Sequence, residues 1–180
     1  MATDRAAFPV FAPILEEGKS GKAPRYGNGI VIGKLMNVST APNYTICSAL
    51  ARYKHRFEYA VVTLGTTEIP TAAAVTMFGY KLNANTLTDT IMAGIPGGFG
   101  YIKRERMDGK IKHCVSWLYN VTFTPPSDSA ITKGATVTFT TPSLTGTALW
   151  EHPSWRELFY FDSFKEAKAF LKCKAGIGNE

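Results

Sequence analysis

The chain has 180 residues, 45% of them hydrophobic, and a formal net charge of +6, which is typical of one globular domain and excludes a disordered chain. No apolar run is long enough to cross a bilayer as a helix, and the N-terminus lacks the order of a secretion signal. Its three cysteines are odd in number and far apart, so we expect buried free thiols in a cytoplasmic product.

The excess positive charge lies mainly in two clusters, residues 52–56 and 103–112. Lys and Arg in such clusters can bind the phosphates of a nucleic acid. They equally suit a solvated face or a contact between subunits, and we favour these two interpretations because neither cluster forms a basic helix or tail.

The first predicted element is a strand over residues 8–15, whose two prolines favour an edge or an extended arm. A flexible loop follows, so residues 1–28 are expected to form an N-terminal arm. Residues 29–38 predict a short strand with a bulge at Gly33. Residues 40–56 are irregular and predict a long loop, which in a compact domain favours an interaction role.

Residues 57–64 are β-branched and aromatic, which predicts a strand. Pro70 suits the first turn of a short helix, and Gly79 can supply the left-handed residue that ends it. Residues 86–92 predict another strand, after which a Pro-Gly-Gly sequence at 96–98 turns the chain.

The most regular stretch is residues 99–150, in which Asp108-Gly109 joins two strands as a hairpin turn. In the second strand every other residue is apolar, which predicts one face on a core. The other face carries hydroxyls and amides with hardly a charge, whereas a sheet face open to water usually carries Lys and Glu. The same alternation returns over residues 135–140. The expected core face is Val115, Trp117, Tyr119, Val121 and Phe123.

The chain closes with a short strand over residues 157–161 and a helix. Ser163 and Glu166 form a capping box at the start of this helix, and Gly176 ends it. These elements predict an α+β fold in a single domain, residues 1–180. Its main body would be a β-sandwich or partly closed barrel of antiparallel strands, flanked by the short helix and the C-terminal helix.

The sequence contains no motif of catalytic or metal-binding chemistry. It has no phosphate-binding loop or nucleophile elbow, and His55, His113 and His152 have no partner at ligand spacing. Trp150 and Trp155 flank His152 and suit a platform for a ring or base, although packing under the C-terminal helix is the simpler interpretation. We therefore expect a structural protein, with no enzyme activity, cofactor or metal.

Five segments, in their order and spacing, resemble the major tail proteins, or tail tube proteins, of long-tailed bacteriophages. The chain departs from that family at residues 51–56, which are basic here and commonly acidic there. The segments are FAPILEEGKSGKAPRYG, TLGTTEIPTAAAVTMFGY, GFGYIKRERMDGKIKHCVSWLYNVTF, TKGATVTFTTPSLTGTAL and FDSFKEAKAFL.

The resemblance implies a virion protein whose subunits close into hexameric rings. In that family one sheet of each subunit joins its neighbours to line a channel, and the rings stack into the tube through which phage DNA leaves. The implied partners are other copies of the chain, the tape measure, terminator and distal tail proteins, and DNA that passes without sequence-specific binding. No membrane, cofactor or small-molecule substrate is implied.

A channel in which a duplex slides must not hold phosphates, because each neutralised phosphate adds to retention. We therefore expect the lumen to be lined by the uncharged polar faces, and the candidates are Ser116, Asn120, Thr122, Thr136, Thr138 and Thr140. The positive loop and the N-terminal arm should lie at subunit contacts, opposite acidic residues such as Glu16, Glu17 or Glu68. These contact candidates are Arg52, Lys54, His55, Arg56, Phe8 and Phe11.

Two alternatives stay open. A tail terminator or head-to-tail connector would share the fold and stop at one ring. A small nucleic-acid-binding β-barrel would stack bases on Tyr101, Trp117 or Tyr119, but the alternation puts Trp117 and Tyr119 on the apolar face.

Overall fold

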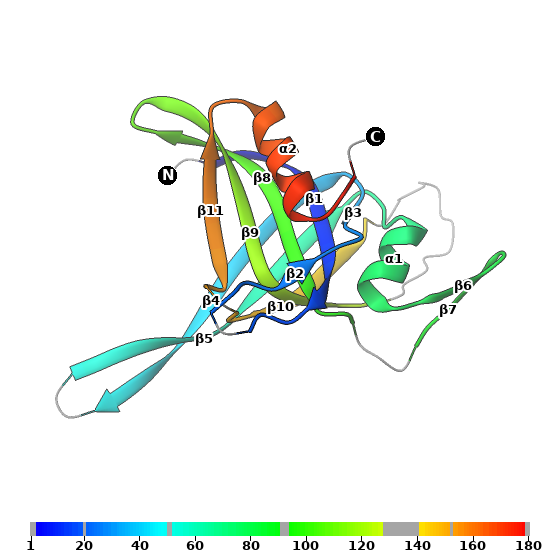
Figure 1. Cartoon of the computed structure of the whole chain (residues 1–180), viewed down its shortest axis with the longest axis horizontal. Helices are drawn as coiled ribbons and strands as arrows, with labels where there is room; N and C mark the ends of the chain where they lie inside the picture. The colour runs from blue at the N-terminus through cyan, green and yellow to red at the C-terminus, as the bar shows by residue number, and fades with distance from the viewer. Residues whose placement is uncertain are drawn as a thin grey trace, which may run out of the picture.

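The computed structural model describes residues 3–19, 21–49, 52–90, 94–127, 141–151 and 153–178, of which residues 3–5, 47–49 and 52–54 are described by backbone alone. This part of the chain is mostly antiparallel strands with two helices, an α+β fold (Figure 1). Neither helix of the described residues is long and apolar enough to span a membrane. The elements are β1 (Thr3–Glu16), β2 (Arg25–Tyr26), β3 (Ile30–Val31), β4 (Leu35–Ala49), β5 (Arg52–Thr66), α1 (Thr71–Phe78), β6 (Lys81–Asn83), β7 (Thr86–Thr88), β8 (Gly97–Met107), β9 (Lys110–Thr124), β10 (Ser143–Leu149), β11 (Arg156–Phe161) and α2 (Phe164–Lys174).

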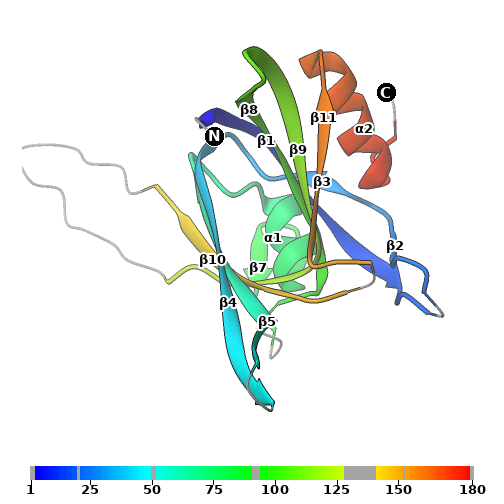
Figure 2. The same ribbon diagram turned by 90° about the vertical axis from the view of Figure 1, so that its left-hand side faces the viewer.

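The main sheet has nine strands in the order β2-β1-β8-β9-β10-β5-β4, with β3 paired to β1 and β11 paired to β9. One edge of β9 pairs with β8, and the other pairs first with β11 and then with β10. The sheet divides where β11 and β10 separate, and β10, β5 and β4 turn across β1, β8 and β9 (Figures 1 and 2). Strand β4 passes close to β1 without pairing to it, so the sheet does not close into a barrel.

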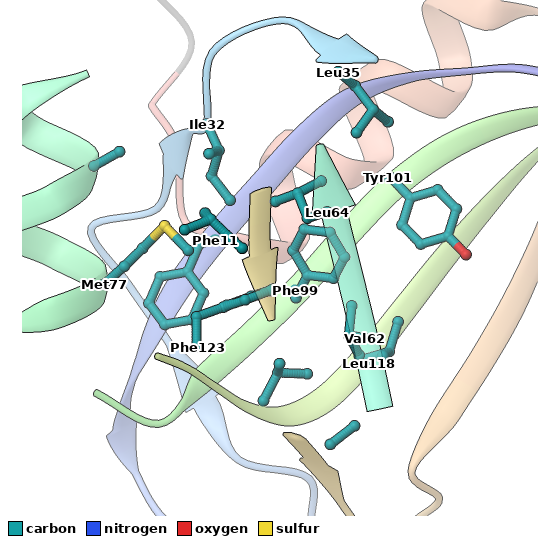
Figure 3. Packing of buried hydrophobic residues seen from close by; sticks show 14 of the residues in the cluster. Phe11, Ile32, Leu35, Val62, Leu64, Met77, Phe99, Tyr101, Leu118 and Phe123 are labelled. Carbon is teal, nitrogen blue, oxygen red and sulfur yellow. The ribbon is translucent and has the colours of Figure 1, made fainter. Parts of the chain in front are cut away.

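The first hydrophobic cluster fills the space between the two parts of the sheet (Figure 3). Helix α1 contributes to it through Ala73, Met77 and Phe78, which are buried. The helix follows Pro70 and ends at Gly79, whose φ of 71° is left-handed, as the sequence predicted. The fully buried members from the sheet include Phe11, Phe99, Leu118 and Phe123.

The second cluster lies between the sheet and α2. Leu171 and Ala175 pack there against the fully buried ring of Trp117. Of the predicted capping box, the structure shows the Ser163 half: Ser163 Oγ accepts a hydrogen bond of 3.2 Å from the Lys165 backbone N–H. Gly98 permits the close approach of Trp117, since a Cβ at this position would lie 2.2 Å from a carbon of that ring.

Strand β9 does not have the single apolar face that its alternation predicted. Val115, Trp117 and Tyr119 belong to the second cluster, whereas Val121 and Phe123 belong to the first. The pairing moves from Phe99↔Leu118 to Gly97↔Val121, so β9 advances three residues while β8 advances two. This bulge rotates the strand and exchanges its faces. The prediction for Ser116 is therefore wrong: this residue is fully buried on the inner side of the sheet.

Two segments expected to be an arm and a loop are strands of the sheet. Residues 3–16 form β1, which pairs with β8 along most of its length, so this part of the predicted arm belongs to the sheet. The prolines are tolerated because a register shift between Ala7 and Val10 spans Pro9, and because only the short strands β2 and β3 pair with the opposite edge. The described part of the predicted loop, residues 40–49 and 52–56, is not a loop either: it lies in the antiparallel pair β4 and β5.

Candidate assembly surfaces

The outer part of the β4–β5 hairpin projects from the body as a two-stranded ribbon (Figures 1 and 2). We call residues 41–49 and 52–59 the arm. Nine residues of extended chain span about 30 Å. Residues 41–46 are all exposed, as are His55, Arg56, Glu58 and Tyr59. Among the arm side chains that the structure describes, only Phe57 at the root is half-buried. A lone two-stranded hairpin is marginally stable in water, and the arm therefore gains from any surface that covers it.

Several arm side chains are of the kinds that protein interfaces use. Tyr44 is 53% exposed, Ile46 59% and Tyr59 37%, and Arg56 is exposed beside them. A side-chain hydrogen bond links the two strands of the arm, in which Thr45 Oγ1 donates to Glu58 Oε2 at 3.0 Å. Aromatic residues and Arg are enriched at the centres of interfaces, and the arm combines both.

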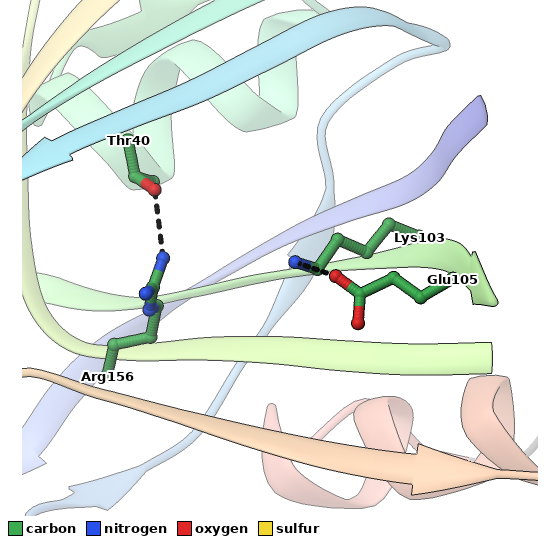
Figure 4. Close-up of polar contacts among 4 residues, drawn as sticks. All are labelled: Thr40, Lys103, Glu105 and Arg156. Atoms are coloured by element: carbon green, nitrogen blue, oxygen red, sulfur yellow. Dashed lines mark hydrogen bonds and ion pairs between the residues drawn. The ribbon is translucent and has the colours of Figure 1, made fainter. Parts of the chain in front are cut away.

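The root of the arm is fixed to the body by a stack of three side chains. The rings of Phe57 and Trp155 are 5.0 Å apart and nearly parallel, at 8°. The Arg156 guanidinium lies 4.5 Å from the centroid of Trp155. Nη1 of Arg156 also donates a hydrogen bond of 3.0 Å to Thr40 Oγ1 in β4 (Figure 4). Trp155 therefore packs against the first cluster and not under α2, whereas Trp150 is 57% exposed.

The outer face of β4, β5, β10 and the end of β9 carries hydroxyls and amides without charge. The register sets Thr124, Thr145, Thr63 and Ser39 opposite one another across the four strands. Residues that are directly opposite share a face of the sheet. The next row is Thr122, Thr147, Val61 and Ala41, and the row on the other side is Ser143, Gly65 and Asn37.

We call these three rows the hydroxyl face. No charged residue occurs in them, and most of their side chains are exposed. The residues between them on β5 and β10, including Val62, Leu64, Leu144 and Ala148, are fully buried in the first cluster, whereas Val38 and Thr40 of β4 are half-buried. The alternation therefore makes the hydroxyl face the outer surface of this part of the sheet.

The predicted lumen residues are distributed unevenly. Thr122 lies on the hydroxyl face and is half-buried. Asn120 is half-buried one pair further along β9, and its Nδ2 donates to Glu151 Oε2 at 3.4 Å. Thr136, Thr138 and Thr140 lie outside the described residues. The sequence missed Ser39, Thr63 and Thr145, although the alternation of residues 143–149 was a signal for the last of these.

The predicted contact residues also divide. His55 and Arg56 are exposed on the arm, and Arg52 and Lys54 lie in β5, with side chains outside the description. The prediction for Phe11 is wrong, because this side chain is fully buried. Phe8 packs within the chain against the second cluster. Of the proposed acidic partners, Glu16 forms an exposed ion pair of 2.9 Å with Arg25, and Glu17 and Glu68 are exposed.

The described residues hold no group of three or more His, Cys, Asp or Glu side chains that could bind a metal ion. Burial raises the pKa of the Cys114 thiol, which keeps the thiol protonated and unreactive. No protein-family model matches this chain, and no curated protein has a sequence that matches it.

Proposed function

We propose that this chain is the tube-forming protein of a long-tailed phage. Copies of it assemble into hexameric rings, and the rings stack into a conduit for DNA ejection into the host. The resemblance of five sequence segments to major tail proteins supports the proposal. The structural observation that carries it is the arm, a ribbon that exposes Tyr44, Ile46 and Tyr59 to water.

The arm needs a partner outside its own chain. Its root is fixed by Phe57, Trp155 and Arg156, and from there it extends away from the body (Figure 1). Fully burying one large apolar side chain contributes about 2 kcal/mol, so covering the three exposed ones gives a substantial gain toward association. A ring of identical subunits supplies one receiving surface for each arm.

The free edge of β4 supports the same proposal. In the described part of the chain, β4 pairs with β5 alone, so its other edge, which passes close to β1 near the body, has no strand partner. A long open edge invites uncontrolled pairing with other chains. Ring closure would pair this edge of β4 with a defined neighbour.

The hydroxyl face is our revised candidate for the wall of the bore. Thr, Ser and Asn side chains hydrate a duplex without neutralising its phosphates, so they release no counterions and do not retain DNA. Thr122 stays a lumen candidate from the sequence, and the neighbouring rows add Ser39, Thr63, Thr124, Thr145 and Thr147.

The test is electron microscopy of the purified protein beside a variant without the outer arm. Tyr44 and Phe57 are a cross-strand pair, so replacing residues 45–56 by Asn-Gly closes the hairpin and keeps the stack on Trp155. We expect tubes from the native chain and folded monomers from this variant. A matched control replaces residues 82–87 by Asn-Gly between the paired Lys81 and Thr88, and should form tubes.

Two results would contradict the proposal: a native chain that stays monomeric at every concentration, and an arm variant that forms normal tubes. Single rings that never stack would favour the terminator or connector alternative.

A further inference from the structure

Three aromatic rings surround the ammonium group of Lys174 in the last turn of α2. Its Nζ is 4.6 Å from the ring centroid of Phe159 in β11, 5.1 Å from that of Tyr119 in β9 and 5.9 Å from that of Phe170 in α2. Phe159 and Phe170 contact each other with centroids 4.7 Å apart and planes at 49°. The rings therefore form the walls of a small site that three different elements build.

A polar chain closes the site on one side. Lys174 Nζ donates to Tyr119 Oη at 3.4 Å, and Tyr119 Oη donates to Glu157 Oε2 at 2.5 Å. Within the described residues no carboxylate forms an ion pair with Lys174, so the negative charge of Glu157 reaches the ammonium through the tyrosine hydroxyl. Burial lowers the pKa of Lys174, and the charge of Glu157 opposes this effect.

The neighbouring Lys168 shows what an ordinary contact of this helix looks like. Its Nζ lies 4.8 Å from the centroid of one ring, that of Phe8. One cation–π contact contributes little, whereas several rings around one cation bind alkylammonium and quaternary ammonium groups. Both lysines are half-buried, but Lys174 has three rings around its ammonium group and Lys168 has one.

We propose that Tyr119, Phe159 and Phe170 form an aromatic cation site for alkylammonium groups, and that the side chain of Lys174 is its resident ligand. This contact fixes the end of α2 on the sheet. The next residue, Ala175, is buried in the second cluster, and its carbonyl accepts a hydrogen bond of 3.0 Å from the Gly29 N–H. Through Ala175 the site also holds the chain segment between β2 and β3.

Chemical rescue of a cavity variant tests the site. Lys174→Ala removes the resident cation and should lower the melting temperature by about 4 °C. n-Butylammonium or tetramethylammonium chloride should then raise the melting temperature of this variant with a saturating dependence on concentration. n-Butanol and sodium chloride at the same concentrations should not. Lys168→Ala is the matched control on the same helix, and neither it nor the native chain should respond.

Two further variants make the result specific. Lys174→Met keeps the apolar stem without the charge and should also be less stable than the native chain. Adding Phe159→Leu to Lys174→Ala should abolish the rescue. The proposal is overturned if Lys174→Met melts with the native chain, or if the ammonium salts stabilise Lys168→Ala as much as Lys174→Ala.

Discussion

Phe57 in the arm and Trp155 before β11 stack face to face, with centroids 5.0 Å apart. This contact joins the arm to the body, so its loss should let the root open. We expect Trp155→Ala to speed tryptic cleavage within residues 52–56 by about fivefold. A stacked pair contributes about 1 kcal/mol beyond its buried area, and the opening of the root governs proteolysis. Cleavage rates from gel densitometry give the measurement. Phe164→Ala, at an exposed aromatic residue of α2, should leave the rate unchanged. Equal rates in the native chain and both variants would contradict the prediction.

The absence of charge from the hydroxyl face leads to a second prediction. Placing Lys at both Thr145 and Thr147 should turn a wall that does not hold DNA into one that does, because each new phosphate contact releases counterions. The retention should fall steeply as salt rises. Co-sedimentation of duplex DNA with assembled tubes measures it.

The control places Lys at Thr86 and Thr88, which are also exposed and two residues apart on one strand. If this control retains as much DNA as the Thr145 and Thr147 variant, the hydroxyl face does not line the bore.

The elements predicted best from sequence are those with local determinants. Gly79 ends α1 in a left-handed conformation, and Ser163 caps α2 through its own side chain. Asp108 and Gly109 turn the hairpin with φ values of 50° and 78°, the positive values that such a turn requires. Each of these signals acts within a few residues, so neighbouring sequence suffices to recognise it.

The features that the sequence missed depend on pairing between distant strands. The bulge that separates Tyr119 from Val121 follows from the register of β9 against β8. The local sequence of β9 has no glycine or other residue that would predict a bulge at this point. The sequence of the arm predicts a loop because Pro42 and the cluster of basic residues are untypical of strands. The hydroxyl face combines strands that are far apart in the chain. It can be recognised only when the pairing register of all four strands, β4, β5, β9 and β10, is known.

The buried ion pair between Lys103 and Glu105 gives a third prediction. Its atoms are 2.5 Å apart, the Glu105 side chain is 3% exposed, and Glu105 Oε2 has no hydrogen-bond partner among the described residues (Figure 4). Glu105→Ala leaves a largely buried lysine unpaired, which we expect to lower the free energy of unfolding by about 3 kcal/mol. Replacing both residues, Lys103→Met with Glu105→Leu, should recover most of this loss, because it removes both charges.

Urea unfolding measures all of these variants. Asp162→Ala breaks the Lys112–Asp162 pair, in which the aspartate is 82% exposed, and should change stability little because exposed pairs contribute little. A double variant that is less stable than Glu105→Ala would show that the pair stabilises the fold.

A fourth prediction concerns alkaline pH and the hydroxyl of Tyr26. This group donates a hydrogen bond of 2.5 Å to the Tyr119 carbonyl, and its ring packs edge-on against Trp117. Burial raises the pKa of Tyr26 and of Tyr119, and raises that of Tyr160 to about 12. The folded protein therefore keeps protons that the unfolded chain releases near pH 10. The stability from these groups is complete below about pH 10 and is lost as pH rises further.

Tyr26→Phe removes one of these protons together with its hydrogen bond. At pH 7 it should be less stable than the native chain by about 1 kcal/mol, because the carbonyl loses its partner. Above pH 10 its stability should fall less steeply, so that the two curves converge. Urea midpoints between neutral and strongly alkaline pH give this comparison. Tyr44→Phe, at an exposed tyrosine of the arm, should follow the native curve, and a Tyr26→Phe curve that stays parallel to the native one would refute the assignment.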